Sequence, residues 1–168
     1  MRNRVHQTFS REIMIRVAGW GLGVFLAGCE SDLPPAAQNL PWEVVLTGTN
    51  FCWEITDPGR DGKLGTVDDL HLAPPLRLPA NIPTRVLLRS RDYLYTFELT
   101  ALQIKQIAIP DLTYFVEFNS GKPGESEFRG DQFCNNAHNA LSGTVIIQSW
   151  RDYRRWQAIA ETEQQTQR

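Results

Sequence analysis

The chain has 168 residues, of which 42% are hydrophobic and 21% are charged, a composition typical of one globular domain rather than of a disordered segment. Its 17 basic and 19 acidic residues give a net charge of −2. Nucleic-acid binding is not favoured, because that affinity depends on a concentrated basic face. Three cysteines are too few for a disulfide scaffold or a four-thiolate zinc site.

The first 28 residues have the pattern of a bacterial secretory signal. Four arginines and one glutamate precede the apolar run Val17–Phe25, which is shorter than the roughly 20 residues of a membrane-spanning helix. Leu26–Cys29 (LAGC) then resembles the lipobox of bacterial lipoproteins, in which the cysteine is acylated and becomes the new N-terminus. A short transmembrane anchor that contains a cysteine is the alternative. We predict a signal peptide over 1–28 and a lipid on Cys29, which would anchor the protein in the bacterial cell envelope, facing the periplasm.

Loss of the signal peptide would change the charge of the protein. Residues 1–28 hold four basic residues and one acidic residue, which leaves 13 basic and 18 acidic residues in the other 140, a net charge of −5. An acidic exported domain suits a basic protein partner better than anionic lipid. Residues 29–41, with Pro34 and Pro35, are predicted to form a tether.

From residue 42 onward, short runs rich in Val, Ile, Thr, Phe and Tyr alternate with turn residues. This pattern predicts an all-β sandwich or barrel over 42–160. The eight predicted strands are Trp42–Thr47, Asn50–Thr56, Leu76–Leu78, Thr84–Ser90, Tyr93–Leu99, Ile104–Ile109, Thr113–Asn119 and Gly143–Ser149. One short helix is predicted over Trp150–Ala160, and Glu161–Arg168 is predicted to be a polar, frayed tail.

Two further groups of polar residues could bind a metal ion. Cys134 and His138 lie four residues apart before the last predicted strand, the spacing at which mononuclear copper proteins present a thiolate and an imidazole. A loop with a buried thiol and a surface histidine is the alternative.

Earlier in the chain, four carboxylates lie in a Gly-rich loop and could bind a calcium ion. A solvated turn is favoured for this loop, and His71 after it is taken as a surface residue. These carboxylates are Asp57, Asp61, Asp68 and Asp69.

Four collinear segments resemble the periplasmic domain of cytochrome c oxidase subunit II. They are Asn50–Ile55 (an aromatic strand), Asp57–Leu70 (an insertion loop), Leu76–Leu88 (strand, turn, strand) and Arg89–Pro110. The resemblance runs from about Thr47 to Trp156. It implies a cupredoxin-like Greek-key sandwich and, as partners, the catalytic subunit of a haem-copper oxidase or other respiratory membrane proteins and cytochrome c.

The resemblance also implies a dinuclear copper A centre, but most of its ligand positions differ here. Tyr95 stands at the first histidine, and Gly130, or Asp131 in a shorter loop, stands at the first cysteine. Gln132 replaces the glutamate whose carbonyl is a ligand, and Leu141 replaces the methionine. Cys134 and His138 remain, so an intact copper A centre is not expected. At most one copper ion could bind, with Tyr95 as a possible third ligand.

Three functions stay open from the sequence. The first is an accessory or electron-transfer component of a respiratory haem-copper oxidase that has lost most copper A ligands. The second is a mononuclear copper-binding cupredoxin, and the third is a free-standing interaction lipoprotein. We find no catalytic constellation, so the chain is at most a non-catalytic subunit of an oxidase.

Two residues of the aromatic strand have roles that the resemblance suggests. Trp53 lies where the family keeps aromatic residues that receive electrons from cytochrome c, and a core or surface aromatic is the alternative. Cys52 could form a disulfide with Cys134 in an oxidising compartment, because that strand runs near the copper loop in the family. Trp53 and Cys52 are expected on opposite faces of the strand.

Overall fold

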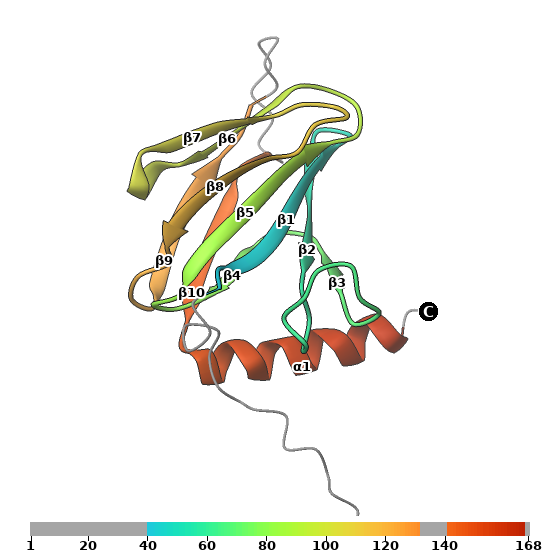
Figure 1. Ribbon diagram of the computed structural model, residues 1–168, viewed down its shortest axis with the longest axis vertical. Coiled ribbons are helices and arrows are strands. Elements are labelled where there is room, and N and C mark those ends of the chain that lie inside the picture. Colours follow the sequence, from blue (N-terminus) through green and yellow to red (C-terminus); the bar gives the residue numbers. More distant parts are fainter. Residues whose placement is uncertain (1–39, 132–140, 167–168) are drawn as a thin grey trace, which may run out of the picture. The chain divides into compact units, whose positions relative to one another are not determined.

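The structure, a computed structural model, describes residues 40–131 and 141–166, which form ten strands and one α-helix (Figure 1). Contacts divide the chain into Met1–Asp32 and Leu33–Arg168, and all described residues belong to the second unit. The elements are β1 (Trp42–Thr49), β2 (Cys52–Asp57), β3 (Leu70–Leu72), β4 (Leu76–Pro79), β5 (Pro83–Ser90), β6 (Tyr95–Leu99), β7 (Ile104–Ala108), β8 (Tyr114–Asn119), β9 (Gly124–Arg129), β10 (Gly143–Gln148) and α1 (Trp150–Thr166). A 3-10 turn, η2 (Thr100–Leu102), joins β6 to β7.

The strands make two five-stranded sheets, which confirms the predicted β-sandwich. One sheet has the order β3-β2-β1-β5-β8 and the other has the order β4-β10-β9-β6-β7. Most neighbours are antiparallel, but β1 pairs with β5 and β4 pairs with β10 in parallel. Strands that are distant in the chain are therefore neighbours in each sheet, as in a Greek-key arrangement.

The core lies between the sheets and follows the two-residue period of the strands. In β5 the alternate residues Thr84, Val86, Leu88 and Ser90 are buried, because successive side chains point to opposite faces. The largest buried side chains are aromatic or aliphatic and come from both sheets: Trp53, Tyr95, Tyr153, Phe97, Phe128, Leu46, Leu70, Leu76, Leu78, Ile82, Leu88 and Leu141.

Two strands were not predicted from the sequence. β9, with the sequence GESEFR, buries only Phe128 and was assigned in part to a turn because of its glycine and polar residues. It nevertheless pairs with β10 and β6 and so completes the second sheet. β3 has three residues, pairs with β2 and ends the loop that follows Asp57.

Helix α1 is longer than the sequence predicted. The predicted helix ended at Ala160, but the helix continues to Thr166, so the prediction of a tail was wrong for residues 161–166. Distant contacts hold this extension. The Gln164 side chain accepts a hydrogen bond from the His71 backbone N–H (2.8 Å) and donates one to the Asp69 carbonyl (3.0 Å). In the described part of the chain, no helix is long and apolar enough to cross a membrane.

A buried polar network fixes α1 to the sandwich. The Asp57 carboxylate accepts hydrogen bonds from the Tyr153 hydroxyl, from Gln157 Nε2 (2.6 Å) and from the Gly59 N–H (3.0 Å). The Trp42 indole N–H donates to the Tyr153 hydroxyl oxygen at 3.0 Å. Burial raises the pKa of Asp57 to about 6, although these hydrogen bonds act in the opposite direction. The first strand, the loop after β2 and the helix therefore meet around one carboxyl group.

Candidate metal-centre end of the sandwich

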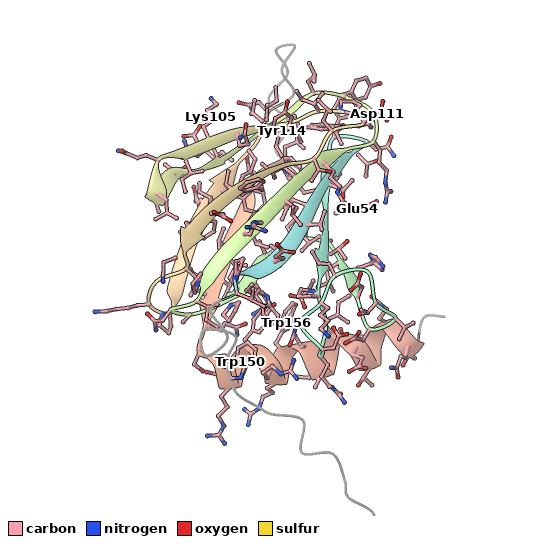
Figure 2. All side chains as sticks on the ribbon, viewed as in Figure 1. Glu54, Lys105, Asp111, Tyr114, Trp150 and Trp156 are labelled. Atoms are coloured by element: carbon pink, nitrogen blue, oxygen red, sulfur yellow. The ribbon has the colours of Figure 1, made fainter. Side chains whose placement is uncertain are left out.

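The described positions that carry the resemblance to a copper centre, Tyr95, Gly130 and Leu141, lie at the end of the sandwich opposite α1. We call this the Tyr95 end, and we call the other the helix end. The Tyr95 end is built from the β1–β2 turn, the β5–β6 loop and the residues Gly130 and Leu141 beside β9 and β10. Asp111 and Tyr114 mark the same end in Figure 2, whereas Trp150 and Trp156 mark the helix end.

Tyr95, at the first histidine position, is a fully buried side chain with a hydrogen-bonded hydroxyl. The hydroxyl donates to Asp92 Oδ1 at 2.7 Å and accepts from the Phe51 N–H at 3.2 Å. Burial first, and then the bond to Asp92, raise the pKa of Tyr95 to about 12. The phenol is therefore neutral at physiological pH. Copper binding would require its deprotonation and the loss of the bond that it donates.

The β1–β2 turn is held in a strained conformation by the same two side chains. Asn50 has φ 47° and Phe51 has φ 61°, the left-handed region that residues with a Cβ seldom occupy. The Asn50 N–H donates to Asp92 Oδ2 at 2.6 Å, and the Phe51 ring stacks on Tyr93 with centroids 5.1 Å apart. Although burial raises the pKa of Asp92, hydrogen bonds from Tyr95 and from the backbone lower it overall, so the carboxylate stays ionised. Tyr95 and Asp92 act here as a clamp on the turn.

Gly130, at the first cysteine position, lies where the backbone leaves no room for a side chain. A Cβ on Gly130 would be 2.7 Å from the Leu141 carbonyl oxygen, 2.8 Å from the Thr96 carbonyl oxygen and 3.0 Å from Trp53 Nε1. Leu141, at the methionine position, is fully buried. Its carbonyl oxygen accepts a hydrogen bond from Trp53 Nε1 at 2.9 Å.

Trp53 belongs to the core. Its side chain is 1% exposed, and its ring packs on Tyr95 and Phe97 with centroids 5.8 and 6.1 Å away. Cys52 beside it is exposed, on the opposite face of β2. Cys29, Gln132, Cys134 and His138 lie outside the described residues. The lipid on Cys29, the copper ligands and the Cys52–Cys134 disulfide therefore stay predictions.

The four acidic residues that could have bound calcium accept hydrogen bonds from their own loop or from α1. Asp61 Oδ1 accepts from the Lys63 N–H (2.8 Å), Asp68 Oδ2 from the Asp61 N–H (3.0 Å) and Asp69 Oδ2 from the Gly65 N–H (2.8 Å). Asp57 is buried against the helix as described above. Within the described ranges, no group of three metal-ligating side chains comes together.

The described residues at the ligand positions, Tyr95, Gly130 and Leu141, do not fit a dinuclear copper centre. That centre needs two bridging thiolates. A thiolate at residue 130 would need a Cβ where two carbonyl oxygens already lie, and Asp131, the alternative position in a shorter loop, carries a carboxylate and not a thiol. A neutral phenol takes the place of an imidazole, and a buried leucine takes the place of a thioether. Sequence reasoning identified these substitutions but missed Asp92 and the clamp. The only sign of the clamp in the local sequence is that Asp92 precedes Tyr95 by three positions.

Removing the Tyr95 hydroxyl should loosen this end of the sandwich. We expect Tyr95→Phe to lower the free energy of unfolding by about 1–2 kcal/mol, because the Phe51 N–H loses its acceptor and Asp92 loses a donor. Urea denaturation monitored by tryptophan fluorescence measures this change. The matched control is Tyr93→Phe, whose ring keeps its stack on Phe51 and which should change stability by less than about 0.5 kcal/mol. Equal effects of the two variants would contradict the clamp.

Architecture and site define the class of the protein: a cupredoxin-like β-sandwich whose described ligand positions are filled by packed, hydrogen-bonded residues. No protein-family model matches the chain. A curated relative, the alternative cytochrome c oxidase subunit 2 of Bradyrhizobium diazoefficiens, is 26% identical over 136 residues. The match covers 68% of this chain and 49% of that protein, so the chain spans about half the length of its curated relative.

Two solved structures have the same fold. The periplasmic domain of subunit II of cytochrome oxidase (CoxB) of Bradyrhizobium japonicum matches with a TM-score of 0.60 and 19% identity, over 73% of this chain and 94% of that one. The same kind of domain, in a mixed disulfide with the thioredoxin-like TlpA, matches with a TM-score of 0.61 and 18% identity, over 79% and 97%. The described residues thus form a cupredoxin-like domain similar to cytochrome c oxidase subunit II, as predicted.

Proposed function

We propose that this chain is a subunit II-like accessory domain of a haem-copper oxidase, held at the periplasmic side of a membrane by a lipid on Cys29, and that it works without a dinuclear copper centre. The similarity to oxidase subunit II supports the oxidase assignment. The observation that carries the loss of copper A is the close approach of two carbonyl oxygens at Gly130. In this proposal the sandwich is kept as a docking module, and electron transfer from cytochrome c does not pass through Trp53, which is buried.

The test is recovery of the tagged full chain from the solubilised membranes of the bacterium that makes it. We expect a haem-copper catalytic subunit to co-purify, and we expect less than one copper per chain to be attributable to this protein. The matched variant is Cys134→Ser with His138→Ala, which removes the two remaining candidate ligands. Because docking should not depend on copper, this variant should recover the same amount of the catalytic subunit.

Three results would go against the proposal in different ways. Recovery that is always free of haem would favour the free-standing interaction lipoprotein. One copper per chain, lost in the double variant, would favour the mononuclear copper protein. Two coppers per chain would restore the dinuclear centre and contradict the argument from Gly130. Release of palmitate and similar acids from residue 29 by hydrolysis, followed by mass spectrometry, tests the anchor separately.

A further inference from the structure

In the described part of the chain, four edge strands end the two sheets: β3 and β8 in one sheet, β4 and β7 in the other. An open edge attracts further strands unless the sequence or a neighbouring element blocks it. β3 has three residues, and Gln164 of α1 accepts a hydrogen bond from the His71 N–H at 2.8 Å. β4 contains Pro79 and lies beside α1, and β7 carries the exposed Lys105. Three of the four edges thus have a feature that opposes pairing.

The fourth edge strand, β8, has none of these protections. Its six residues, YFVEFN, include no Pro, Gly, Lys or Arg. Among the described residues β8 pairs with β5 alone, and its other edge belongs to no ladder. Figure 1 shows β8 at the end of its sheet that is farthest from β3. β8 is therefore the edge of this sandwich that is best suited to pair with a strand of another molecule.

The side of the sandwich around β8 also exposes apolar side chains. Phe115 on β8 is 52% exposed, and Leu112 before β8 and Leu102 in η2 are 49% and 47% exposed. β7, the edge strand of the other sheet, lies next to β8 and holds the half-buried Ile104 and Ile107. A molecule that paired with β8 would therefore cover apolar surface as well as backbone groups, and burial of such surface favours association.

The sequence of β8 is complementary to a second copy of itself. Because side chains alternate along a strand, an antiparallel pair with a two-fold axis at Val116 keeps the inner and outer faces of both strands aligned. On the inner face, Val116 then meets Val116 of the other copy, and Tyr114 meets Phe118. On the outer face, Phe115 meets Glu117. An axis at Glu117 would instead set two carboxylates opposite each other, which is destabilising.

The charges beside this edge are complementary in the same register. The Arg85 guanidinium lies over the Phe115 ring, 5.1 Å from its centroid, and binds Glu117 Oε1 at 2.5 Å. Arg85 also binds Glu43, on the side of β5 away from this edge. Glu117 of one copy, placed opposite Phe115 of the other, would therefore approach the second Arg85. The two-fold axis repeats this contact, so two carboxylates would meet two guanidinium groups.

We propose that this chain forms a two-fold symmetric dimer in which the β8 strands of two copies pair antiparallel about Val116. The five-stranded sheet of one copy would continue into that of the other. The paired strands are short, and a stable interface buries roughly 800 Å² on each partner, so we expect a dissociation constant of about 1–100 μM. This interface goes beyond the proposed function and uses neither copper nor an oxidase.

The test measures self-association of residues 30–168 by sedimentation velocity over a range of concentrations, with a reductant present so that no disulfide joins the copies. This part contains every described core residue, and contacts place all of them in one compact unit. We expect a monomer that converts to a dimer as the concentration rises. Amide hydrogen exchange of residues 114–119 should slow with this conversion, whereas that of residues 70–72 in the protected edge β3 should stay constant.

Two variants of Phe115 test the register. F115E places a carboxylate opposite Glu117 of the other copy, whereas F115K places an ammonium group there. Both remove the same exposed ring, so the loss of apolar contact is equal. The dissociation constant of F115E should exceed that of F115K at least about tenfold, because the axis repeats the charge pair.

The matched control is I159E, which replaces an equally exposed apolar residue of α1 (54%) and adds the same charge as F115E. It should change the dissociation constant by less than about twofold, since a charge far from the interface is screened. Melting curves like that of the wild type show that the variants fold.

A protein that stays monomeric at the highest concentration would overturn the proposal. Equal dissociation constants for F115E and F115K would also overturn it, because the register about Val116 predicts opposite charges in one variant and like charges in the other. An effect of I159E as large as that of F115E would move the interface to α1. None of these results depends on the recovery of a haem-copper subunit, so failure here is distinguishable from failure of the proposed function.

Discussion

Gly130→Ala is expected to lower the free energy of unfolding by about 2 kcal/mol, and Gly130→Cys by at least as much. The new Cβ would meet the Leu141 and Thr96 carbonyl oxygens at 2.7 and 2.8 Å. Both contacts are with backbone atoms, so relief requires β6 or the chain around residue 141 to move, and such overpacking typically costs 1–3 kcal/mol. The Trp53–Leu141 hydrogen bond would be displaced as well. Urea denaturation of purified protein measures the loss.

Gly124→Ala is the matched control, since Gly124 begins β9 and nothing lies within 4 Å of its Cβ position. Alanine restricts the conformations of the unfolded chain more than glycine does. The free energy of unfolding of this variant should therefore equal that of the wild type or exceed it by about 0.5 kcal/mol. A Gly130→Cys variant that is as stable as the wild type would contradict the structural account. If that variant also bound two copper ions, the argument from the space at Gly130 would be wrong, although the wild type would still lack the second thiolate.

The second large effect concerns the dependence of stability on pH. Because burial raises the pKa of Asp57 from 3.8 to about 6, the folded protein binds a proton between these values that the unfolded chain releases. The contribution of Asp57 to stability is therefore greatest below pH 4 and is lost as the pH rises through about 6. A shift of about two pKa units corresponds to about 3 kcal/mol.

Asp57→Asn isolates this effect from those of the other carboxylates. The free energy of unfolding of the wild type, measured relative to Asp57→Asn, should fall by about 3 kcal/mol between pH 3.5 and pH 7.5. Tyr153→Phe removes a hydrogen bond that lowers the pKa of Asp57. In that variant, the pH-dependent fall in the free energy of unfolding should therefore end above pH 6. Parallel pH profiles of the wild type and Asp57→Asn would show that Asp57 is not buried as described.

The sequence predicted those parts of the fold that local patterns determine. The alternation of buried and exposed residues in β5 and β6 is visible along the chain, and both strands were predicted within two residues of their bounds. β9 was missed because a central strand with one buried side chain has little alternation. The last six residues of α1 were missed because Gln164 is held by residues 93 to 95 positions away, which no local pattern contains.

The candidate site could likewise be predicted only in part from the sequence. The resemblance identified positions 95, 130 and 141 as altered ligands, but only the structure shows what these residues contact. Tyr95 is the centre of a hydrogen-bonded clamp through Asp92, and Gly130 is a point of close contact with the backbone of two other segments. Both results depend on the spacing of strands that are distant in the sequence, which residue types alone do not determine.

The hydrogen bond from Trp42 to Tyr153 joins residues 111 positions apart. β1 pairs on one edge with β2, which follows it directly, but takes its parallel neighbour on the other edge from β5, so the strand has both neighbours only after residue 90 is available. A protein threaded through a membrane from its N-terminus would thus reach the far side with its first strand incomplete, and would close the network around Asp57 only when α1 arrives. Folding dominated by such distant pairings is slow. If the chain is exported in this way, the edge of β1 that later meets β5 stays unpaired until β5 is available.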